Sequence, residues 1–135
     1  MTRPVFERVA VIGLGLMGSS AALAALERGA AGQVRGVDPA LADAGAIPLV
    51  TLPEAAAWAD LLVLAVPLEV MGETLRAAAR HLRPTTLLTD LASVKAPVAE
   101  LARRHLPWPE NCVGAHPMAG GDRTGFAAAD ASLFA

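Results

Sequence analysis

One histidine in this chain stands in a setting suited to proton transfer. His116 lies in the stretch GAHPMAG, between small residues and a proline that restricts its backbone. An imidazole has an ordinary pKa of about 6.5, so at pH 7 it is mostly neutral and can accept a proton from a substrate hydroxyl. A second stretch, DLASVK, adds the hydroxyl of Ser93 and the ammonium of Lys95. We expect these three side chains to form the catalytic part of one site, although a lone histidine in an apolar setting can also be a satisfied core residue.

A glycine-rich motif near the start of the chain predicts a binding site for a dinucleotide. The motif GLGLMG consists of Gly13, Leu14, Gly15, Leu16, Met17 and Gly18. It follows an apolar run typical of a strand and opens a predicted helix, which is the context that gives this pattern its meaning. Gly13 permits a tight turn, Gly15 lets a pyrophosphate approach the backbone, and Gly18 lets the helix pack on the strand. The N–H groups and dipole at the helix start suit phosphate groups. Such turns also occur at strand–helix junctions that bind nothing.

The acidic residue after the second predicted strand indicates which dinucleotide is bound. Asp38 lies 38 − 18 = 20 residues past the last glycine, where a carboxylate can accept hydrogen bonds from an adenosine ribose and repel a 2′-phosphate. Pro39 and Ala40 follow it in place of an arginine. We therefore predict NAD rather than NADP as the cofactor. Val66 and Pro67 end a further strand beside the same crevice and are predicted to line it, although Pro67 also fits an ordinary first-turn proline.

Short β-branched runs alternate with longer segments rich in alanine and leucine. Strands are predicted at 8–12, 33–37, 61–66, 86–90 and 112–114, with a weak one near 49–51, and helices at 17–28, 69–81 and 94–105. Residues 38–47 leave room for barely one or two turns of helix. The alternation predicts an α/β fold of the Rossmann type, a doubly wound and mainly parallel sheet with helices on both faces. The carboxyl ends of the last two strands would then bring Ser93, Lys95 and His116 to the nicotinamide end of the cofactor.

The composition excludes several other classes of function. With 135 residues the chain is expected to form one domain, and 11 basic against 13 acidic residues leave no cationic surface for nucleic acid. Apolar residues make up 54% of the chain, but their runs are too short to span a membrane. The single cysteine, Cys112, is expected to be buried and indicates a reducing cytoplasm. The three histidines and this cysteine show no metal-ligand spacing, so we predict no metal.

Four stretches of the sequence resemble the prephenate and arogenate dehydrogenase family. They are VAVIGLGLMGSS, LLVLAVP, LLTDLASVKAPV and VGAHPMAGGDRTGFAAADASLF, and together they span nearly the whole chain. The resemblance implies an NAD-dependent oxidative decarboxylation of prephenate to 4-hydroxyphenylpyruvate in tyrosine biosynthesis. It also implies that His116 takes the proton of the ring hydroxyl and that Ser93 bonds the histidine or the substrate. Lys95 is the weaker candidate.

The family pattern extends beyond this sequence. Family members continue into a helical domain that dimerises and binds the substrate carboxylates, so the resemblance implies that residues 1–135 are the NAD-binding domain alone. We expect this domain by itself to be inactive and the full-length form to be a cytoplasmic homodimer. Three alternatives remain open: an arogenate dehydrogenase, a β-hydroxyacid dehydrogenase, and a stand-alone NAD-binding module that senses redox state.

Overall fold

The computed structural model describes residues 4–92 and 96–114, and strands and helices alternate through them. The first half contains β1 (Phe6–Ile12), α1 (Leu16–Glu27), β2 (Ala31–Val37) and α2 (Leu52–Trp58). The second half contains β3 (Leu61–Leu64), α3 (Leu68–Ala79), β4 (Leu87–Asp90), α4 (Ala96–His105), a 3-10 turn at Pro109–Asn111, and β5 (Cys112–Gly114). The five stronger strand predictions and the three helix predictions are confirmed to within a few residues at each end.

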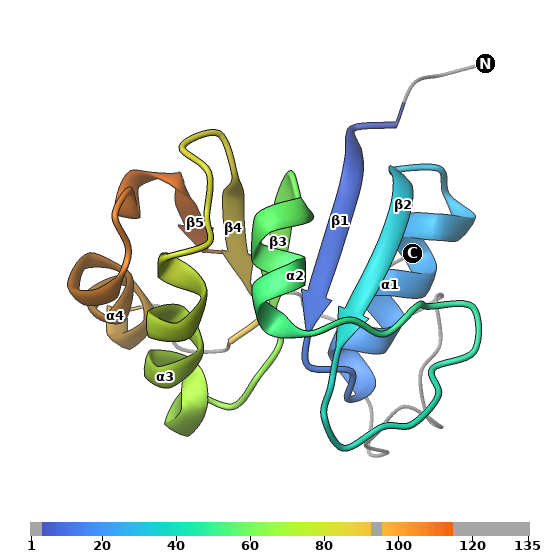
Figure 1. Cartoon of the computed structure of the whole chain (residues 1–135), viewed down its shortest axis with the longest axis horizontal. Coiled ribbons are helices and arrows are strands. Elements are labelled where there is room, and N and C mark those ends of the chain that lie inside the picture. The colour runs from blue at the N-terminus through green and yellow to red at the C-terminus, as the bar shows by residue number, and fades with distance from the viewer. Residues whose placement is uncertain (1–3, 93–95, 115–135) are drawn as a thin grey trace.

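The five strands form one parallel sheet in the order β2-β1-β3-β4-β5. Helices cover both of its faces: in Figure 1, α2, α3 and α4 lie in front of the sheet and α1 lies behind it. This arrangement is Rossmann-like and confirms the predicted fold class. Because β1 leads to β2 on one side and β3 leads to β4 on the other, the links after β1 and β3 diverge. Ligands of such sheets bind in the crevice at this point.

The alternation of side chains along β1 divides the core between the two faces. Val9 and Val11 pack on the side of α1, whereas Ala10 and Ile12 pack on the side of α2, α3 and α4. All four are at most 5% exposed. Burial on both faces explains why this strand is a continuous apolar run in the sequence.

The crossover after β2 differs from the prediction. Residues 38–47, where the sequence leaves room for barely one or two turns of helix, form turns and no helix. The weak strand near 49–51 is reduced to one parallel bridge, between Gly36 and Leu49. Its hydrogen bonds run from the Gly36 N–H to the Pro48 carbonyl and from the Val50 N–H to the Gly36 carbonyl. This segment therefore follows the edge of β2 without extending the sheet by a full strand.

The helix of this crossover, α2, was not predicted from the sequence. A capping box starts it: the Thr51 hydroxyl accepts the Glu54 N–H at 3.3 Å, and the Glu54 carboxylate accepts the Thr51 N–H at 3.1 Å. Two N–H groups that a helix start leaves unpaired, one in the first turn and one at the cap residue, are thus satisfied. The Thr-x-x-Glu spacing was visible in the sequence, but the seven residues of α2 are too few to show a clear helical period.

An ionic cluster holds the amino end of β3. The Asp60 carboxylate accepts the Arg8 N–H at 3.1 Å and the Arg83 guanidinium at 3.2 Å, and Arg83 also donates to the Ala59 carbonyl at 2.7 Å. Burial by itself would raise the pKa of Asp60, but the hydrogen bonds from Arg83 and Arg8 outweigh it and lower that pKa below its ordinary value of 3.8. The cluster joins β1, β3 and the segment before β4 at the edge opposite the crevice.

We expect Asp60→Asn to weaken folding at neutral pH but not in acid. A carboxylate whose pKa is lowered in the folded state stabilises that state above the unfolded pKa, and the contribution is lost as the pH falls through the folded pKa. For a partly exposed ion pair the loss at neutral pH should be about 1 kcal/mol or less. Urea unfolding at a series of pH values, with the exposed Glu110→Gln as control, measures this. A difference from the unchanged protein that persists undiminished in strong acid would contradict it.

Candidate functional site

The glycine-rich turn joins β1 to α1 at the carboxyl edge of the sheet. Gly13 has a φ of +93°, a conformation that favours glycine, and a Cβ there would lie 2.7 Å from the Ala65 carbonyl oxygen. Hydrogen bonds hold the backbone on both sides, from the Gly13 N–H to the Val37 carbonyl and from the Ala65 N–H to the Ile12 carbonyl, each 2.8 Å long. Position 13 therefore requires glycine for the tight turn that the sequence predicts.

Gly18 is closely packed against other atoms of the chain, whereas Gly15 borders open space in the described structure. A Cβ on Gly18 would overlap the Gly13 carbonyl oxygen and lie 3.0 Å from the Ala65 Cβ, so α1 can pack this closely only with glycine at position 18. A Cβ on Gly15 would meet no described atom within 4 Å. The fold therefore needs the glycine at 18, whereas the space beside Gly15 is open.

Helix α1 begins without a side-chain cap. Gly15 is its N-cap residue, no side chain in the described part of the chain caps it, and its first turn has no acidic residue. The first N–H groups of a helix lack partners within the helix, and the helix dipole adds partial positive charge at this end. Leu16, Met17 and Gly18 thus belong to a helix start that can donate hydrogen bonds to an anion beside Gly15.

Asp38 follows β2 and contacts the glycine-rich turn. Its Oδ2 accepts the Leu14 N–H at 3.0 Å, and its Oδ1 accepts the Ala40 N–H at 3.0 Å. The first of these bonds crosses from the end of β2 to the start of the turn, a contact that was not predicted. The two bonds fix the orientation of the carboxylate at the mouth of the turn.

Buried side chains pack against the glycine-rich turn and hydrogen-bond to its backbone. The Leu14 side chain is 1% exposed and packs with Ile47 against Gly36, where a Cβ would lie 2.7 Å from a Leu14 methyl. Ser19, fully buried, donates from its hydroxyl to the Leu14 carbonyl at 2.8 Å. The Leu14 side chain is therefore part of the core, and its N–H and carbonyl are already hydrogen-bonded to Asp38 and Ser19. Sequence reasoning missed Gly36 and Ser19, although a glycine inside a strand is a sign of close approach by another segment.

The link after β3 lies beside the same turn. The Val66 Cγ1 is 3.1 Å from the position that a Cβ on Gly13 would take, and the half-buried Val66 is followed by the exposed Pro67, the N-cap residue of α3. These two residues thus stand at the divergence of the β1 and β3 links. The structure therefore brings Gly13, Asp38 and Val66 together from three separate strand ends.

The three predicted catalytic residues, Ser93, Lys95 and His116, lie outside the described residues. The strands that lead to them are described: Asp90, the last residue of β4, pairs with Gly114, the last residue of β5. The Asp90 carboxylate is fully buried, and its Oδ1 accepts the Ala92 N–H at 3.0 Å in a turn at the end of β4. Both strands end at the same edge as the glycine-rich turn, because the sheet is parallel throughout.

The described residues contain no group of three or more His, Cys, Asp or Glu side chains placed to hold a metal ion. No helix among residues 4–92 and 96–114 is both long and apolar enough to cross a membrane. Cys112, which was expected to be buried, is half-buried and packs beside the core between the sheet and α2, α3 and α4.

The sheet order, the glycine-rich turn and the carboxylate after β2 define the class of Rossmann-type nucleotide-binding domains. Residues 21–135 match the family model described as prephenate dehydrogenase, nucleotide-binding domain. The chain belongs to this family. The match begins inside α1, so the geometry of the glycine-rich turn is evidence independent of it.

Curated relatives and solved structures agree with this family. The chain is 35% identical to a prephenate dehydrogenase of Lactococcus lactis subsp. cremoris over 95% of its own length and 38% of that protein. It is 36% identical to a cyclohexadienyl dehydrogenase of Zymomonas mobilis, with 96% and 47% covered. A crystal structure of the A. aeolicus prephenate dehydrogenase with hydroxyphenyl propionate and NAD+ has the same fold, with a TM-score of 0.81 at 24% identity, and 95% of this chain and 47% of that chain are covered. This chain thus spans less than half the length of each.

Proposed function

We propose that this chain is the NAD-binding domain of a prephenate dehydrogenase, an enzyme that oxidises and decarboxylates prephenate. The observation that carries the proposal is the start of α1 at Gly15, which no side chain among the described residues caps or fills and which lies next to a carboxylate fixed at the end of β2. Membership of the prephenate dehydrogenase family supports this assignment over a β-hydroxyacid dehydrogenase. The names of the two curated relatives support a compound with a cyclohexadiene ring as the substrate that the enzyme oxidises.

The residues present fit NAD. The N–H groups of the first turn of α1, at Leu16, Met17 and Gly18, would hold the pyrophosphate, and Gly15 leaves the room for it to approach. Asp38 would accept hydrogen bonds from the adenosine ribose. Val66, together with Pro67, would border the cofactor on the side of β3. When bound, NAD supplies the acceptor for a hydride from the substrate ring.

The protein's own part in the reaction is to align the substrate and to move one proton. His116 is proposed to accept the proton of the ring 4-hydroxyl, and Ser93 to hydrogen-bond that imidazole or the substrate. Lys95 is a weaker candidate for a contact in the same place. Loss of the ring carboxylate as CO2 makes the product aromatic and drives the reaction forward, so most of the catalysis would come from alignment. The full-length enzyme is proposed to act as a homodimer.

The cofactor assignment is tested at Asp38. We expect Asp38→Ala to raise the Kd for NAD by about tenfold or more, because a ribose bound to a carboxylate loses charge-assisted hydrogen bonds. The Kd for NADP should change much less, since its 2′-phosphate gains from removal of the negative charge. Calorimetric titration of the 135-residue chain with both dinucleotides measures the difference.

Asp38→Asn is the matched control for this experiment. An asparagine keeps an oxygen for the Leu14 N–H, so it preserves the support that the carboxylate gives to the turn. If only the alanine variant lost affinity, and lost it equally for NAD and NADP, Asp38 would be a residue that shapes the turn and the ribose assignment would be wrong.

A further inference from the structure

Leu14 lies between two glycines in the turn that leads into α1. Glycine has the widest range of backbone conformations because it lacks a Cβ. Gly13 uses part of this range, with a φ of +93°, whereas Gly15 is extended and forms the N-cap of α1. The direction of the peptide group that joins Leu14 to Gly15 is therefore not fixed by local sterics alone. Contacts from other parts of the fold must fix it.

Three contacts hold Leu14 in place. Its N–H donates to Oδ2 of Asp38 at 3.0 Å, and its side chain is buried against Gly36. Its carbonyl accepts a hydrogen bond of 2.8 Å from the hydroxyl of Ser19, a fully buried residue near the start of α1. The Leu14 carbonyl and the Gly15 N–H belong to the same peptide group. Of the three contacts, the bond from Ser19 is thus the one that acts directly on this group.

The bond from Ser19 determines where the Gly15 N–H points. The C=O and N–H of a trans peptide group point in opposite directions. Because the Leu14 carbonyl points toward the buried Ser19, the Gly15 N–H points away from the body of α1. No acceptor in the described part of the chain takes this N–H, and a Cβ on Gly15 would meet no described atom within 4 Å. The donor therefore faces the open space where we propose that the pyrophosphate of NAD binds.

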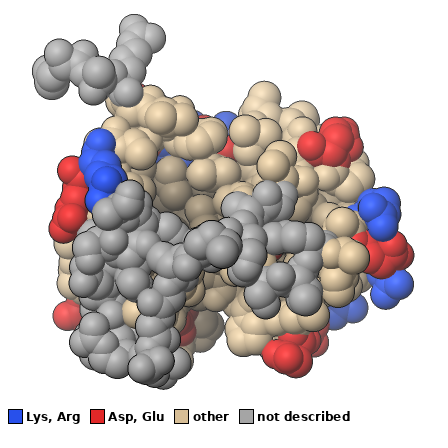
Figure 2. All heavy atoms as spheres, turned by 180° about the vertical axis from the view of Figure 1, so that it is seen from behind, with Lys and Arg blue, Asp and Glu red and all other residues tan. Residues whose placement is uncertain are grey.

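An anion at the start of α1 would meet backbone donors rather than charged side chains of this helix. The first turn of α1, residues 16–19, contains no acidic or basic residue. Seen from behind, on the side of α1, the charged side chains of the described residues lie mainly toward the margins of the molecule (Figure 2). A hydrogen bond weakens steeply as the angle at its hydrogen departs from linear. The direction of the Gly15 N–H thus matters for binding.

Serine at position 19 has a cost that alanine would not have. Alanine has the higher helix propensity, and it needs no hydrogen-bond partner when it is buried. The Ser19 side chain is fully buried, and its hydroxyl makes one described hydrogen bond, to the Leu14 carbonyl. The contribution of this hydroxyl is therefore made at the peptide group between Leu14 and Gly15.

We propose that Ser19 is a positioning residue of the cofactor site. Its hydroxyl holds the Leu14 carbonyl, so that the Gly15 N–H is directed at the pyrophosphate and donates a hydrogen bond to it. This inference rests on the proposed function, because it adds a residue to the NAD site of that proposal. Ser19 itself is buried and would not touch the cofactor.

Ser19→Ala in the 135-residue chain tests this role. Without the hydroxyl, the Leu14 carbonyl loses its described donor and the peptide group can turn. We expect the Kd for NAD to rise about tenfold, since a hydrogen bond to a charged group is weakened. The Kd for ADP should rise by a similar factor, because ADP also contains a diphosphate and lacks the nicotinamide. Calorimetric titration measures both.

A spectroscopic signature separates this role from a general loss of packing. In the unchanged chain, addition of ADP should shift the amide proton of Gly15 to lower field, as expected for an N–H that donates to a phosphate. In Ser19→Ala the same shift should be clearly smaller at saturating ADP. NMR of the isotope-labelled chain measures both shifts. A Gly15 amide that did not respond to bound ADP in the unchanged chain would overturn the proposal without any variant.

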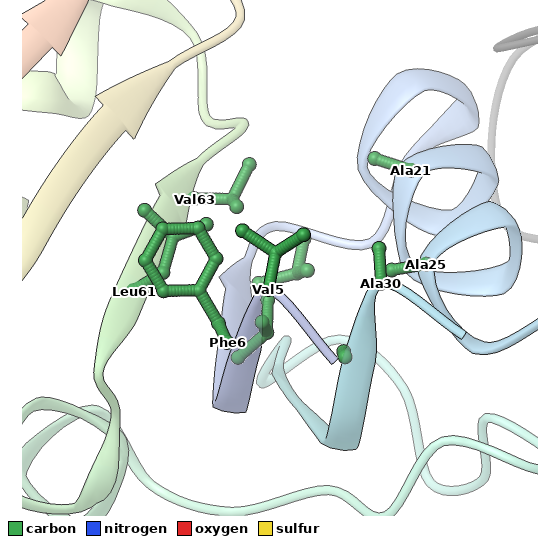
Figure 3. A pocket seen from close by; sticks show the side chains of 10 residues that line it. Val5, Phe6, Ala21, Ala25, Ala30, Leu61 and Val63 are labelled. Atoms are coloured by element: carbon green, nitrogen blue, oxygen red, sulfur yellow. The ribbon is translucent and has the colours of Figure 1, made fainter. Parts of the chain in front are cut away.

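Ala25→Gly is the matched control. Ala25 lies farther along α1 than Ser19 and borders an apolar cavity of about 250 Å³, opposite Phe6 and Val63 (Figure 3). Glycine has a very low helix propensity, so the thermal midpoint should fall by at least as much as in Ser19→Ala. The turn is untouched, and the Kd for NAD should change less than about twofold. An equal loss of affinity in both variants would overturn the proposal.

The two proposals fail in different ways. If the unchanged chain bound NAD and ADP but Ser19→Ala bound both with the same Kd, Ser19 would support the fold alone and the NAD site would stand. If the unchanged chain bound neither ligand, the proposed function would be wrong, and the role of Ser19 would fall with it.

Discussion

Replacing His116 with asparagine in an enzyme restored to the length of its relatives is expected to lower kcat for prephenate by about 10²–10⁴-fold. Asparagine is close in size but cannot accept the proton of the ring hydroxyl near neutral pH, so the chemical step loses its base. KM should change little, because the imidazole would act on the reacting hydroxyl more than on the remainder of the substrate. Steady-state rates over a range of prephenate concentrations separate the two parameters.

His81→Asn serves as the control for this substitution. His81 follows α3 at the edge of the sheet opposite the crevice, so its loss should leave kcat unchanged. The pH dependence adds a second readout: the unchanged enzyme should lose activity as an imidazole becomes protonated, and the His116 variant should lose that limb. Normal turnover by His116→Asn would show that this histidine is structural.

Gly18→Ala is expected to destabilise the domain by about 3 kcal/mol, whereas Gly15→Ala should change its stability by less than about 0.5 kcal/mol. The added methyl at position 18 would overlap the Gly13 carbonyl, a backbone atom that cannot move without breaking the turn. At position 15 the backbone has an extended conformation that alanine adopts, and no described atom lies within 4 Å of the new methyl. The small loss of an N-cap glycine and the gain from a stiffer unfolded chain roughly offset each other.

The variant that leaves the stability of the domain unchanged, Gly15→Ala, should be the one that weakens dinucleotide binding directly. Gly15→Ala places a methyl where the pyrophosphate would approach, so it should weaken NAD binding at least tenfold although the domain stays folded. Urea unfolding measures stability, and titration with NAD measures affinity. If Gly15→Ala bound NAD as tightly as the unchanged chain, the open space beside α1 would not be the phosphate site.

The sequence was sufficient to predict the parts of the molecule that depend on local sterics and strong periodicity. The buried strands are unbroken apolar runs, and the roles of Gly13 and Gly18 follow from contacts within one turn and the link beside it. The alternation of strands and helices was enough to predict a mainly parallel sheet with helices on both faces, but the order of its strands was not predicted. These predictions needed no knowledge of contacts between distant side chains.

The crossover after β2 and the contact of Asp38 with the turn could not be predicted in the same way. Helix α2 depends on a capping box at Thr51 and on packing of two alanines in the core, neither of which gives a periodic signal. The hydrogen bond from the Leu14 N–H to Asp38 joins residues 24 apart in sequence, and it exists only because β2 and β1 end side by side. Ser93, Lys95 and His116 lie outside the described residues, so their roles stay predictions.

The carboxylate at the end of β2 can accept only a limited number of hydrogen bonds. An ionised aspartate offers about four lone-pair sites, and in Asp38 the amides of Leu14 and Ala40 already occupy two of them. Two sites remain, the number of donors that the vicinal diol of a ribose provides, whereas a ribose phosphorylated at its 2′ position has only one hydroxyl left to give. Selection between the two dinucleotides would thus be a matter of counting donors as well as of charge, set by a residue that the backbone has oriented before any ligand arrives.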